Sequence, residues 1–301
     1  MNLQYIGGQR RLKVSFRALL TGLLLAGCVS ATVRAQLLNQ DPVHTPNPIP
    51  ASSTGLDRGY FDMYDVHFGD AHKVFEQILL QHPDDALAAA SDAAAYLFGE
   101  FDRLHIIDVE LFADQNKFDS RGRLNPDPGV RKSFDDRCAQ ANRLADALLQ
   151  RNARDATALY VKTLIAGMQS DYALMIDKRD ITALNLSKQA SGYSRAALQV
   201  QPHMFDAYLA SGVENYMLSL KAAPVRWLLS ITGAGTNKAE GIRLLTLTAN
   251  QGHYLAPFAR MMLSVAALRE NHPQVARALL IALAREYPDN TLYQRQLDRI
   301  H

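Results

Sequence analysis

Apolar residues recur every three or four positions through most of the chain, with polar residues between them. From Gly59 onward this spacing is carried mainly by alanine, leucine, glutamine and arginine, and alternating runs of β-branched residues are almost absent. Such spacing places apolar side chains on one face of an α-helix, whereas a half-buried strand needs strict alternation. The pattern therefore predicts an all-α protein.

The same succession of features closes four of the predicted helices. Each segment ends an amphipathic helix with bulky residues, passes through a polar turn that usually contains proline, and starts a new helical run near aspartate, asparagine or alanine. The four segments are FEQILLQHPDDA (Phe75–Ala86), LADALLQRNARDA (Leu144–Ala156), YSRAALQVQPHMFDA (Tyr193–Ala207) and LLIALAREYPDN (Leu279–Asn290). This recurrence indicates an array of helix–turn–helix units.

These segments resemble the closing half of the tetratricopeptide repeat. In that family the second helix carries a small and then a bulky residue at fixed distances before the proline, and the first helix carries a small residue where the two helices cross. The matching pairs are Ala71 with Phe75, Ala141 with Ala145, Ala190 with Ser194 and Ala276 with Leu280, and the first-helix positions are Gly59, Ala93 and Gly212. The resemblance implies a right-handed superhelical solenoid of antiparallel helix pairs.

The spacing of the repeats is irregular. The markers Pro83, Ala153, Pro202 and Pro288 are separated by 70, 49 and 86 residues, whereas the family's period is about 34 residues. The first and last intervals allow two repeats each, and the middle one fits a single repeat with long helices. We expect five or six helix pairs with insertions, in a repeat domain covering residues 59–301.

One insertion contains the stretch LLSITGAGTNKAEG (Leu228–Gly241). Two close glycines before Lys238 suggest a phosphate-binding loop, but that loop needs a Gly-Lys pair after a β-strand, and neither is present. Thr236 or Asn237 can instead cap a following helix, with Glu240 in its first turn. The stretch therefore predicts a glycine turn and a helix start.

The N-terminal segment differs from the rest. Residues 1–35 contain five basic residues, no acidic residue and an apolar run at Ala18–Gly27, which is typical of a secretory signal and shorter than the roughly 20 residues of a membrane span. The residues LAGC resemble a lipoprotein signal, which would end at residue 27 and leave a lipidated Cys28 as the mature N-terminus. Cleavage after Ala35 is the alternative, and the sequence leaves both open.

Two further segments are predicted to lack regular structure. Residues 36–58 contain four prolines and few large apolar residues, so they are predicted to form a linker, or a loop packed on the first helices. Asp114–Val130 is rich in polar residues, glycine and proline, and predicts an exposed loop.

Charge and cysteine content limit the kinds of partner and the kinds of covalent bond that the chain can be expected to have. The chain has 32 basic and 30 acidic residues, and cleavage before Gln36 would leave 27 basic residues, so the mild basicity gives no reason to expect nucleic-acid binding. With Cys28 lipidated or removed, Cys138 is the single remaining cysteine, and we expect it in the core. The predicted location is the periplasm or the outer membrane of a bacterium.

Chemical motifs are weak. His67 and His72 are five positions apart instead of the four that bring two imidazoles to one helix face, and Asp114–Phe118 begins like a calcium loop but loses its third ligand. Four neighbouring acids are candidates for carboxylate catalysis, although a solvated helix face explains them as well: Glu100, Asp102, Asp108 and Glu110. We expect no catalytic, cofactor-binding or metal-binding residues.

The resemblance also implies a concave binding surface lined by the first helix of each pair. The residues placed there by register are Tyr160, Leu164, Met168, Leu209, Val213, Tyr216, Phe258, Met261 and Val265. Aromatic and methionine side chains give adaptable apolar contacts. At helical spacing, many of these residues fit equally well as core between repeats.

The leading hypothesis is a non-enzymatic scaffold of the bacterial cell envelope that binds a partner protein or peptide on its concave face. One alternative is a structural lipoprotein subunit of an outer-membrane assembly or secretion complex, for which Cys28 is decisive. Another is an enzyme with a helical scaffold and an unrecognised metal or acid–base site. The partner and the oligomeric state are not specified by the sequence.

Overall fold

The computed structural model describes residues 49–50, 53–106, 124–221, 226, 229–231 and 233–300. Over these ranges the chain is helical without a β-strand, so the all-α prediction is confirmed. The elements in chain order are α2 (Gly55–Tyr64), α3 (Phe68–Gln81), α4 (Ala86–Arg103), α7 (Pro128–Arg151), α8 (Ala156–Met175), α9 (Asp180–Val200), η1 (Phe205–Ala207), α10 (Tyr208–Ser219), α12 (Lys238–Gln251), α13 (Ala256–Arg269), α14 (Pro273–Glu286) and α15 (Thr291–Arg299). Among the described helices, none is both long and apolar enough to cross a membrane.

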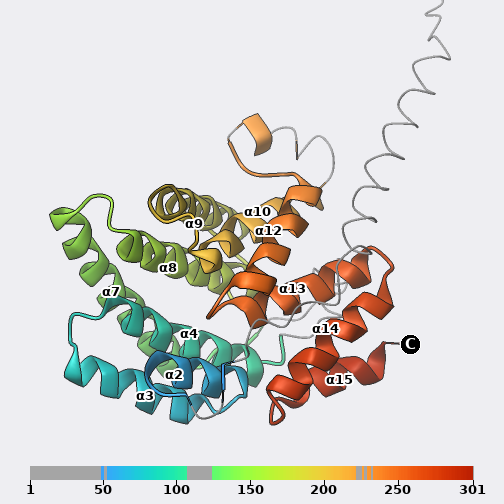
Figure 1. Ribbon diagram of the computed structural model, residues 1–301, viewed down its shortest axis with the longest axis horizontal. Coiled ribbons are helices and arrows are strands. Elements are labelled where there is room, and N and C mark those ends of the chain that lie inside the picture. The colour runs from blue at the N-terminus through green and yellow to red at the C-terminus, as the bar shows by residue number, and fades with distance from the viewer. Residues whose placement is uncertain are drawn as a thin grey trace, which may run out of the picture.

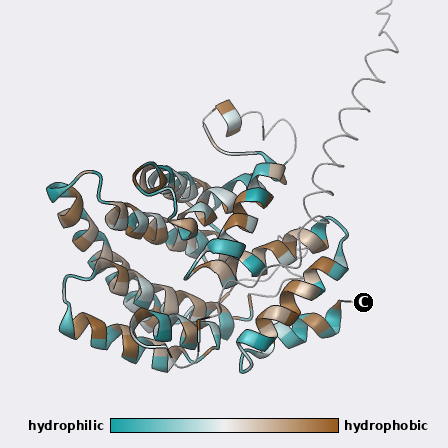
Figure 2. Cartoon of the chain, in the orientation of Figure 1, coloured by the Kyte–Doolittle hydropathy of each residue, from teal (hydrophilic) through white to brown (hydrophobic). Residues whose placement is uncertain are grey.

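Each helix packs against the next one along the chain (Figure 1). Helices such as α3 and α14 carry hydrophobic and hydrophilic residues on the same ribbon, as amphipathic helices do (Figure 2). The small and bulky residues that the repeat pattern singled out are all in the interior: Ala71, Phe75, Ala141, Ala145, Ala190, Ser194, Ala276 and Leu280. At Gly59 a Cβ atom would lie 2.3 Å from the Phe75 ring, so this crossing requires glycine.

Two kinds of turn alternate in the array. After α2, α4 and α13 the chain reverses through a left-handed residue, which is Val66, His105 or Asn271. In the first of these turns the N–H of His67 donates to the carbonyl oxygen of Asp62 at 2.7 Å. After α4 and after α13 a backbone N–H likewise donates to the carbonyl oxygen five residues earlier. The three helix ends therefore share one C-capping motif.

The second kind of turn follows α3, α7, α9 and α14, where the sequence predicted helix ends, and those four ends are confirmed. In three of them an acidic or amide side chain caps the next helix. Asp85 accepts from the N–H of Ala88 at 2.9 Å, and Asp155 and Asn290 play the same part for α8 and α15. These caps satisfy N–H groups that a helix start otherwise leaves unpaired.

The glycine stretch also forms as predicted. Gly233 has a φ of 79°, and the side chain of Asn237 accepts from the N–H of Glu240 to cap α12. Lys238 forms an ion pair at 2.6 Å with Glu270, the C-cap residue of α13. The stretch is therefore a turn and a helix start that joins α12 to its neighbour.

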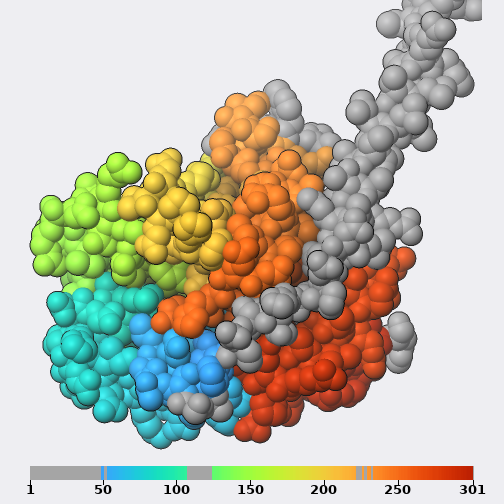
Figure 3. Space-filling view, in the orientation of Figure 1, coloured from blue at the N-terminus to red at the C-terminus, as the bar shows by residue number. Residues whose placement is uncertain are grey.

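The two ends of the array meet, which the sequence did not predict. One apolar cluster combines side chains of α2 and α3 with side chains of α13, α14 and α15. In the space-filling view the blue N-terminal and red C-terminal helices lie side by side (Figure 3). We call this contact between the first and last helices the seam.

Some predicted boundaries shift. The first described helix begins at Gly55 instead of Gly59, and Ile49 is buried in the seam cluster, so the end of the predicted linker packs on the helices. The predicted loop at Asp114–Val130 ends earlier, because Asp127 caps a helix that starts at Pro128. Residues 1–35, including Cys28, lie outside the described residues.

Candidate functional site

The nine predicted binding residues lie on α8, α10 and α13. Five of them are buried: Tyr160, Met168, Tyr216, Met261 and Val265. The other four are half-buried at the edges of the apolar clusters: Leu164, Leu209, Val213 and Phe258. A buried side chain cannot contact a partner in this conformation, so the half-buried residues are the ones on which the predicted groove depends.

Tyr160 of α8 is buried close to Tyr60 of α2 and to Tyr254, which precedes α13. Burial raises the pKa of its phenol well above the usual value, and the nearby Asp206 carboxylate and the Tyr60 and Tyr254 hydroxyls add to the shift. Within the described part of the chain, its hydroxyl has no hydrogen-bond partner. An unpaired buried hydroxyl lowers the free energy of unfolding by about 1–3 kcal/mol. Tyr160 is therefore a position at which the protein is less stable than it could be.

Asp206 holds the start of α13 in place. Its carboxylate accepts the backbone N–H groups of His253, Tyr254 and Leu255 at 2.8, 3.0 and 3.1 Å. Burial raises the pKa of Asp206, while these three hydrogen bonds act in the opposite direction. The side chain thereby fixes the segment from which Tyr254 stacks on Tyr60 of α2 at 4.3 Å between ring centroids.

Hydrogen bonds across the seam join residues more than 180 positions apart. The Tyr64 hydroxyl donates to the carbonyl oxygen of Tyr254 at 2.9 Å, and the Asn290 side chain donates to the carbonyl oxygen of Tyr64 at 2.8 Å. The backbone N–H of Asp289 donates to Asp65 at 2.8 Å. The last two bonds bring the turn between α2 and α3 against the turn between α14 and α15, and the first ties the end of α2 to the turn between α12 and α13.

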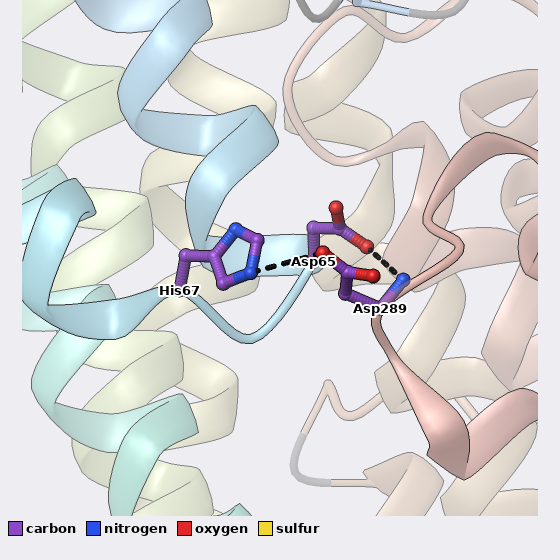
Figure 4. A group of neighbouring side chains, drawn as sticks. All are labelled: Asp65, His67 and Asp289. Carbon is purple, nitrogen blue, oxygen red and sulfur yellow. Dashed lines mark hydrogen bonds and ion pairs between the residues drawn. The ribbon is translucent and has the colours of Figure 1, made fainter.

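Three ionisable side chains converge at that point. Asp65, His67 and Asp289 each offer one oxygen or nitrogen atom, and these atoms lie within 4.8 Å of one another (Figure 4). The His67 Nε2 atom is 3.2 Å from an oxygen of Asp289. Burial, together with the charge of Asp289, raises the pKa of Asp65. We call this group the seam triad.

A small cavity lies beside the triad. It has a volume of about 30 Å³ and is lined by apolar side chains, including Met63, Phe98 and Phe258, with the polar groups of Asp102 and Asn290. A cavity needs roughly 10–15 Å³ to hold one water molecule. The volume of this cavity is therefore enough for a water-sized molecule.

A second polar cluster connects α3, α4 and α7. The fully buried Asp92 lies 2.5 Å from Nδ1 of His72 and also accepts from Arg137. The ring of Tyr96 packs against the His72 imidazole, with centroids 3.9 Å apart. A carboxylate on Nδ1 orients an imidazole for proton transfer, but an aspartate shared between an imidazole and a guanidinium also serves as a structural tie.

Of the acidic candidates, Glu100 does not belong to a solvated helix face. Glu100 is 1% exposed, accepts two hydrogen bonds from Arg103 at 2.7 and 2.8 Å, and accepts the N–H of Asp127 at 2.8 Å. It anchors the start of α7 to α4, and Asp102 lines the cavity. Asp108 and Glu110 lie outside the described residues, as does the calcium-loop candidate at Asp114–Phe118.

Cys138 is a core residue, as predicted. It is 1% exposed, and burial raises the pKa of its thiol to about 12. A thiol in this state is a poor nucleophile and a poor metal ligand at neutral pH.

Sequence reasoning missed the seam triad and the two clusters around Asp206 and Asp92. Within the triad, the Asp-x-His spacing at residues 65 and 67 was the available local signal, whereas Asp289 is 224 positions from Asp65. No periodicity links such distant turns, so only the closed arrangement brings them together.

Comparison of the chain with protein-family models, with curated proteins and with solved structures finds no match.

Proposed function

We propose that the chain is a non-enzymatic, protein-binding scaffold built as a tetratricopeptide-like right-handed solenoid. In this proposal five helix pairs follow one another: α2 with α3, α4 with α7, α8 with α9, α10 with α12 and α13 with α14, and α15 covers the end. Support comes from the alternation of two turn types and from the small residues at the helix crossings.

The binding surface in this proposal is a strip on the first helices of three successive pairs. The observation that carries it is that Leu164, Leu209, Val213 and Phe258 lie at the edges of the apolar clusters and keep contact with solvent. Half-buried apolar side chains on neighbouring helices suit an extended peptide or an amphipathic helix of a partner protein.

Site-specific photocrosslinking in intact cells tests this surface. A photoreactive amino acid at Leu209 or Val213 should capture one discrete partner. The same group at Leu80 of α3 or Ile181 of α9 should not, although these apolar residues are 83% and 79% exposed. With the captured partner purified, Leu209→Asp should weaken binding about tenfold or more, because a charge replaces an apolar contact. Equal capture at the outer positions, or unchanged affinity of Leu209→Asp, would exclude the strip.

We further propose that the chain is exported to the bacterial envelope, where residue 28 decides how it is held. If Cys28 is lipidated, Cys28→Ala should move the protein from the membrane fraction to the soluble fraction. If cleavage occurs after Ala35, the variant should fractionate as the wild type does, and the mature N-terminus determined by sequencing should be Gln36.

An acid–base enzyme is the second candidate, and one observation favours it. His72 is 20% exposed and is held through Nδ1 by a fully buried carboxylate, an arrangement found in general bases. A screen of hydrolase substrates should then reveal an activity that His72→Asn abolishes while the unfolding temperature is retained. An activity equal in both proteins would remove His72 from consideration.

A further inference from the structure

We propose that Asp65, His67 and Asp289 bind a divalent transition-metal ion of the zinc type, and that the bound ion clamps the two ends of the helical array together. This inference goes beyond the scaffold proposal, because it concerns the seam and requires no partner protein.

The donor atoms suit such an ion. One imidazole nitrogen and two carboxylate oxygens are ligands that zinc accepts, with water completing the coordination. In a tetrahedral site the ligand atoms are about 3.4 Å apart when each lies about 2.1 Å from the ion. The His67 and Asp289 atoms are 3.2 Å apart, and all three donors lie within 4.8 Å. Small side-chain rotations would therefore complete the site.

The protein holds these donors on defined elements. Asp65 is the C-cap of α2 and accepts the backbone N–H of Asp289, while His67 is the N-cap of α3. Between them Val66 has a φ of 60°, an unusual conformation for a β-branched residue. Figure 4 shows the three side chains meeting between the α2–α3 turn and the α14–α15 turn. The backbone therefore positions the ligands before an ion binds.

The charges of the triad also favour a cation. Asp65 is 3% exposed, and its carboxylate faces a second carboxylate across the seam. A neutral imidazole leaves both negative charges uncompensated within the triad, and a divalent cation would offset them. A protonated His67 paired with Asp289 is the competing arrangement, and it predicts no effect of metal.

The imidazole selects the class of metal. Magnesium and calcium prefer oxygen ligands only, whereas zinc and cobalt combine nitrogen and oxygen ligands readily. We therefore expect zinc and cobalt to bind, and millimolar magnesium or calcium not to compete.

The test is calorimetric titration of zinc into the metal-free full chain, using wild type and single variants. Wild type should bind zinc at one site, and His67→Asn and Asp289→Asn should lose affinity by about tenfold or more, since each lacks one of three ligands. His253→Asn is the matched control. His253 also pairs with an aspartate at the seam, with its Nε2 atom 2.9 Å from Asp57, but among the residues that the structure describes no third ligand joins this pair. This control should bind zinc as the wild type does.

Two further measurements distinguish metal binding from a purely structural role of these side chains. Cobalt should give a visible d–d absorption band with wild type and His253→Asn, and not with His67→Asn. Saturating zinc should raise the unfolding midpoint of the first two proteins by about 5 °C and leave that of His67→Asn unchanged.

The proposal is wrong if wild type binds no zinc, if His67→Asn and Asp289→Asn bind as tightly as wild type, or if His253→Asn loses the same affinity. Absence of zinc binding with a pH-dependent unfolding midpoint that His67→Asn abolishes would assign the triad to an ion pair alone.

Discussion

The joins between successive helices and the seam between the chain ends are built from different residues. At the joins, small residues such as Ala93, Ala141 and Ala145 are fully buried and let neighbouring helices approach closely. At the seam, large aromatic rings and long-range hydrogen bonds hold the helices together. Phe61 and Tyr64, for example, pack on Tyr287. The joins repeat along the chain, and the seam occurs once.

This difference has an energetic consequence. A join connects segments close in sequence, so little chain entropy is lost when it forms, whereas the seam must close a loop of more than 200 residues. The seam also contains the seam triad and a water-sized cavity beside it. We therefore expect the seam to open before the joins unfold, and to be the part of the fold that responds to ions.

The largest expected effect lies at a join. Arg260 of α13 is 1% exposed and makes a bidentate ion pair with Glu286 of α14 at 2.7 and 2.6 Å. Arg260→Ala leaves a buried carboxylate unpaired and should lower the free energy of unfolding by about 3–5 kcal/mol. Denaturant unfolding measures this value. The double variant Arg260→Met/Glu286→Leu, which removes both charges, should recover most of the lost stability. If it recovers none, the ion pair contributes to stability by more than the neutralisation of a buried charge.

Two phenylalanines compare a join with the seam directly. Phe134 stacks on Tyr172 between α7 and α8, and Phe61 contacts Tyr287 across the seam. Phe134→Ala should cost about 3 kcal/mol in global stability. Phe61→Ala should cost about 2 kcal/mol and act locally, because the seam can separate while the joins persist.

Hydrogen exchange distinguishes these two variants. In Phe61→Ala, the amides of α2 and α15 should exchange faster while those of α8 and α9 keep their protection. Equal acceleration across all helices would show that the seam and the joins unfold as one unit.

Two glycines sharpen the account of the joins. A Cβ atom at Gly241 of α12 would lie 2.5 Å from the backbone nitrogen of Tyr216, whereas a Cβ at Gly192 of α9 meets nothing within 4 Å. Gly241→Ala should therefore destabilise the protein by about 1–3 kcal/mol through overpacking. Gly192→Ala should stabilise it by about 0.5–1 kcal/mol, because alanine favours the helix. Chemical denaturation of both variants measures these changes in the free energy of unfolding. An unchanged free energy of unfolding in Gly241→Ala would contradict the close approach of α10 and α12.

The effect of pH is comparable in size to that of Gly192→Ala and concerns Asp171, near the C-terminal end of α8. Burial raises the pKa of Asp171 to about 7, so the folded chain holds this proton at pH values where the unfolded chain has lost it. Stability from this group is therefore full below about pH 4 and decreases as pH rises towards 7. Asp171→Asn should match wild type at pH 4 and exceed it by about 1 kcal/mol at pH 8, since water reaches part of the side chain. Equal stability of the two proteins at both pH values would contradict this burial.

The sequence was a good guide to the joins because their determinants are local. Helical periodicity predicted the all-α fold, the recurring polar turns predicted four helix ends, and Asn237 was one of two candidate caps for α12. Each of these features depends on residues within about one helical turn of each other. The glycine stretch was likewise interpreted correctly as a turn and a helix start.

The seam could not be predicted in the same way. Asp65 and Asp289 belong to turns that look ordinary in sequence, and their contact depends on the packing of all the helices that lie between them in the chain. The same long-range packing buries Tyr160, Tyr216 and Val265, for which the sequence left open an inner binding surface or the core between repeats. Whether the half-buried strip binds a partner stays a prediction.

The central claim is that the first and last helices are in contact in solution, and a distance measurement between them tests it most directly. Spin labels attached at the exposed positions Gln77 of α3 and Gln294 of α15, in a chain without other cysteines, report this distance by pulsed electron paramagnetic resonance. A closed seam predicts one narrow distance distribution that broadens and lengthens in Phe61→Ala. A broad, long distribution already present in the otherwise unsubstituted protein would show an open array and contradict the account.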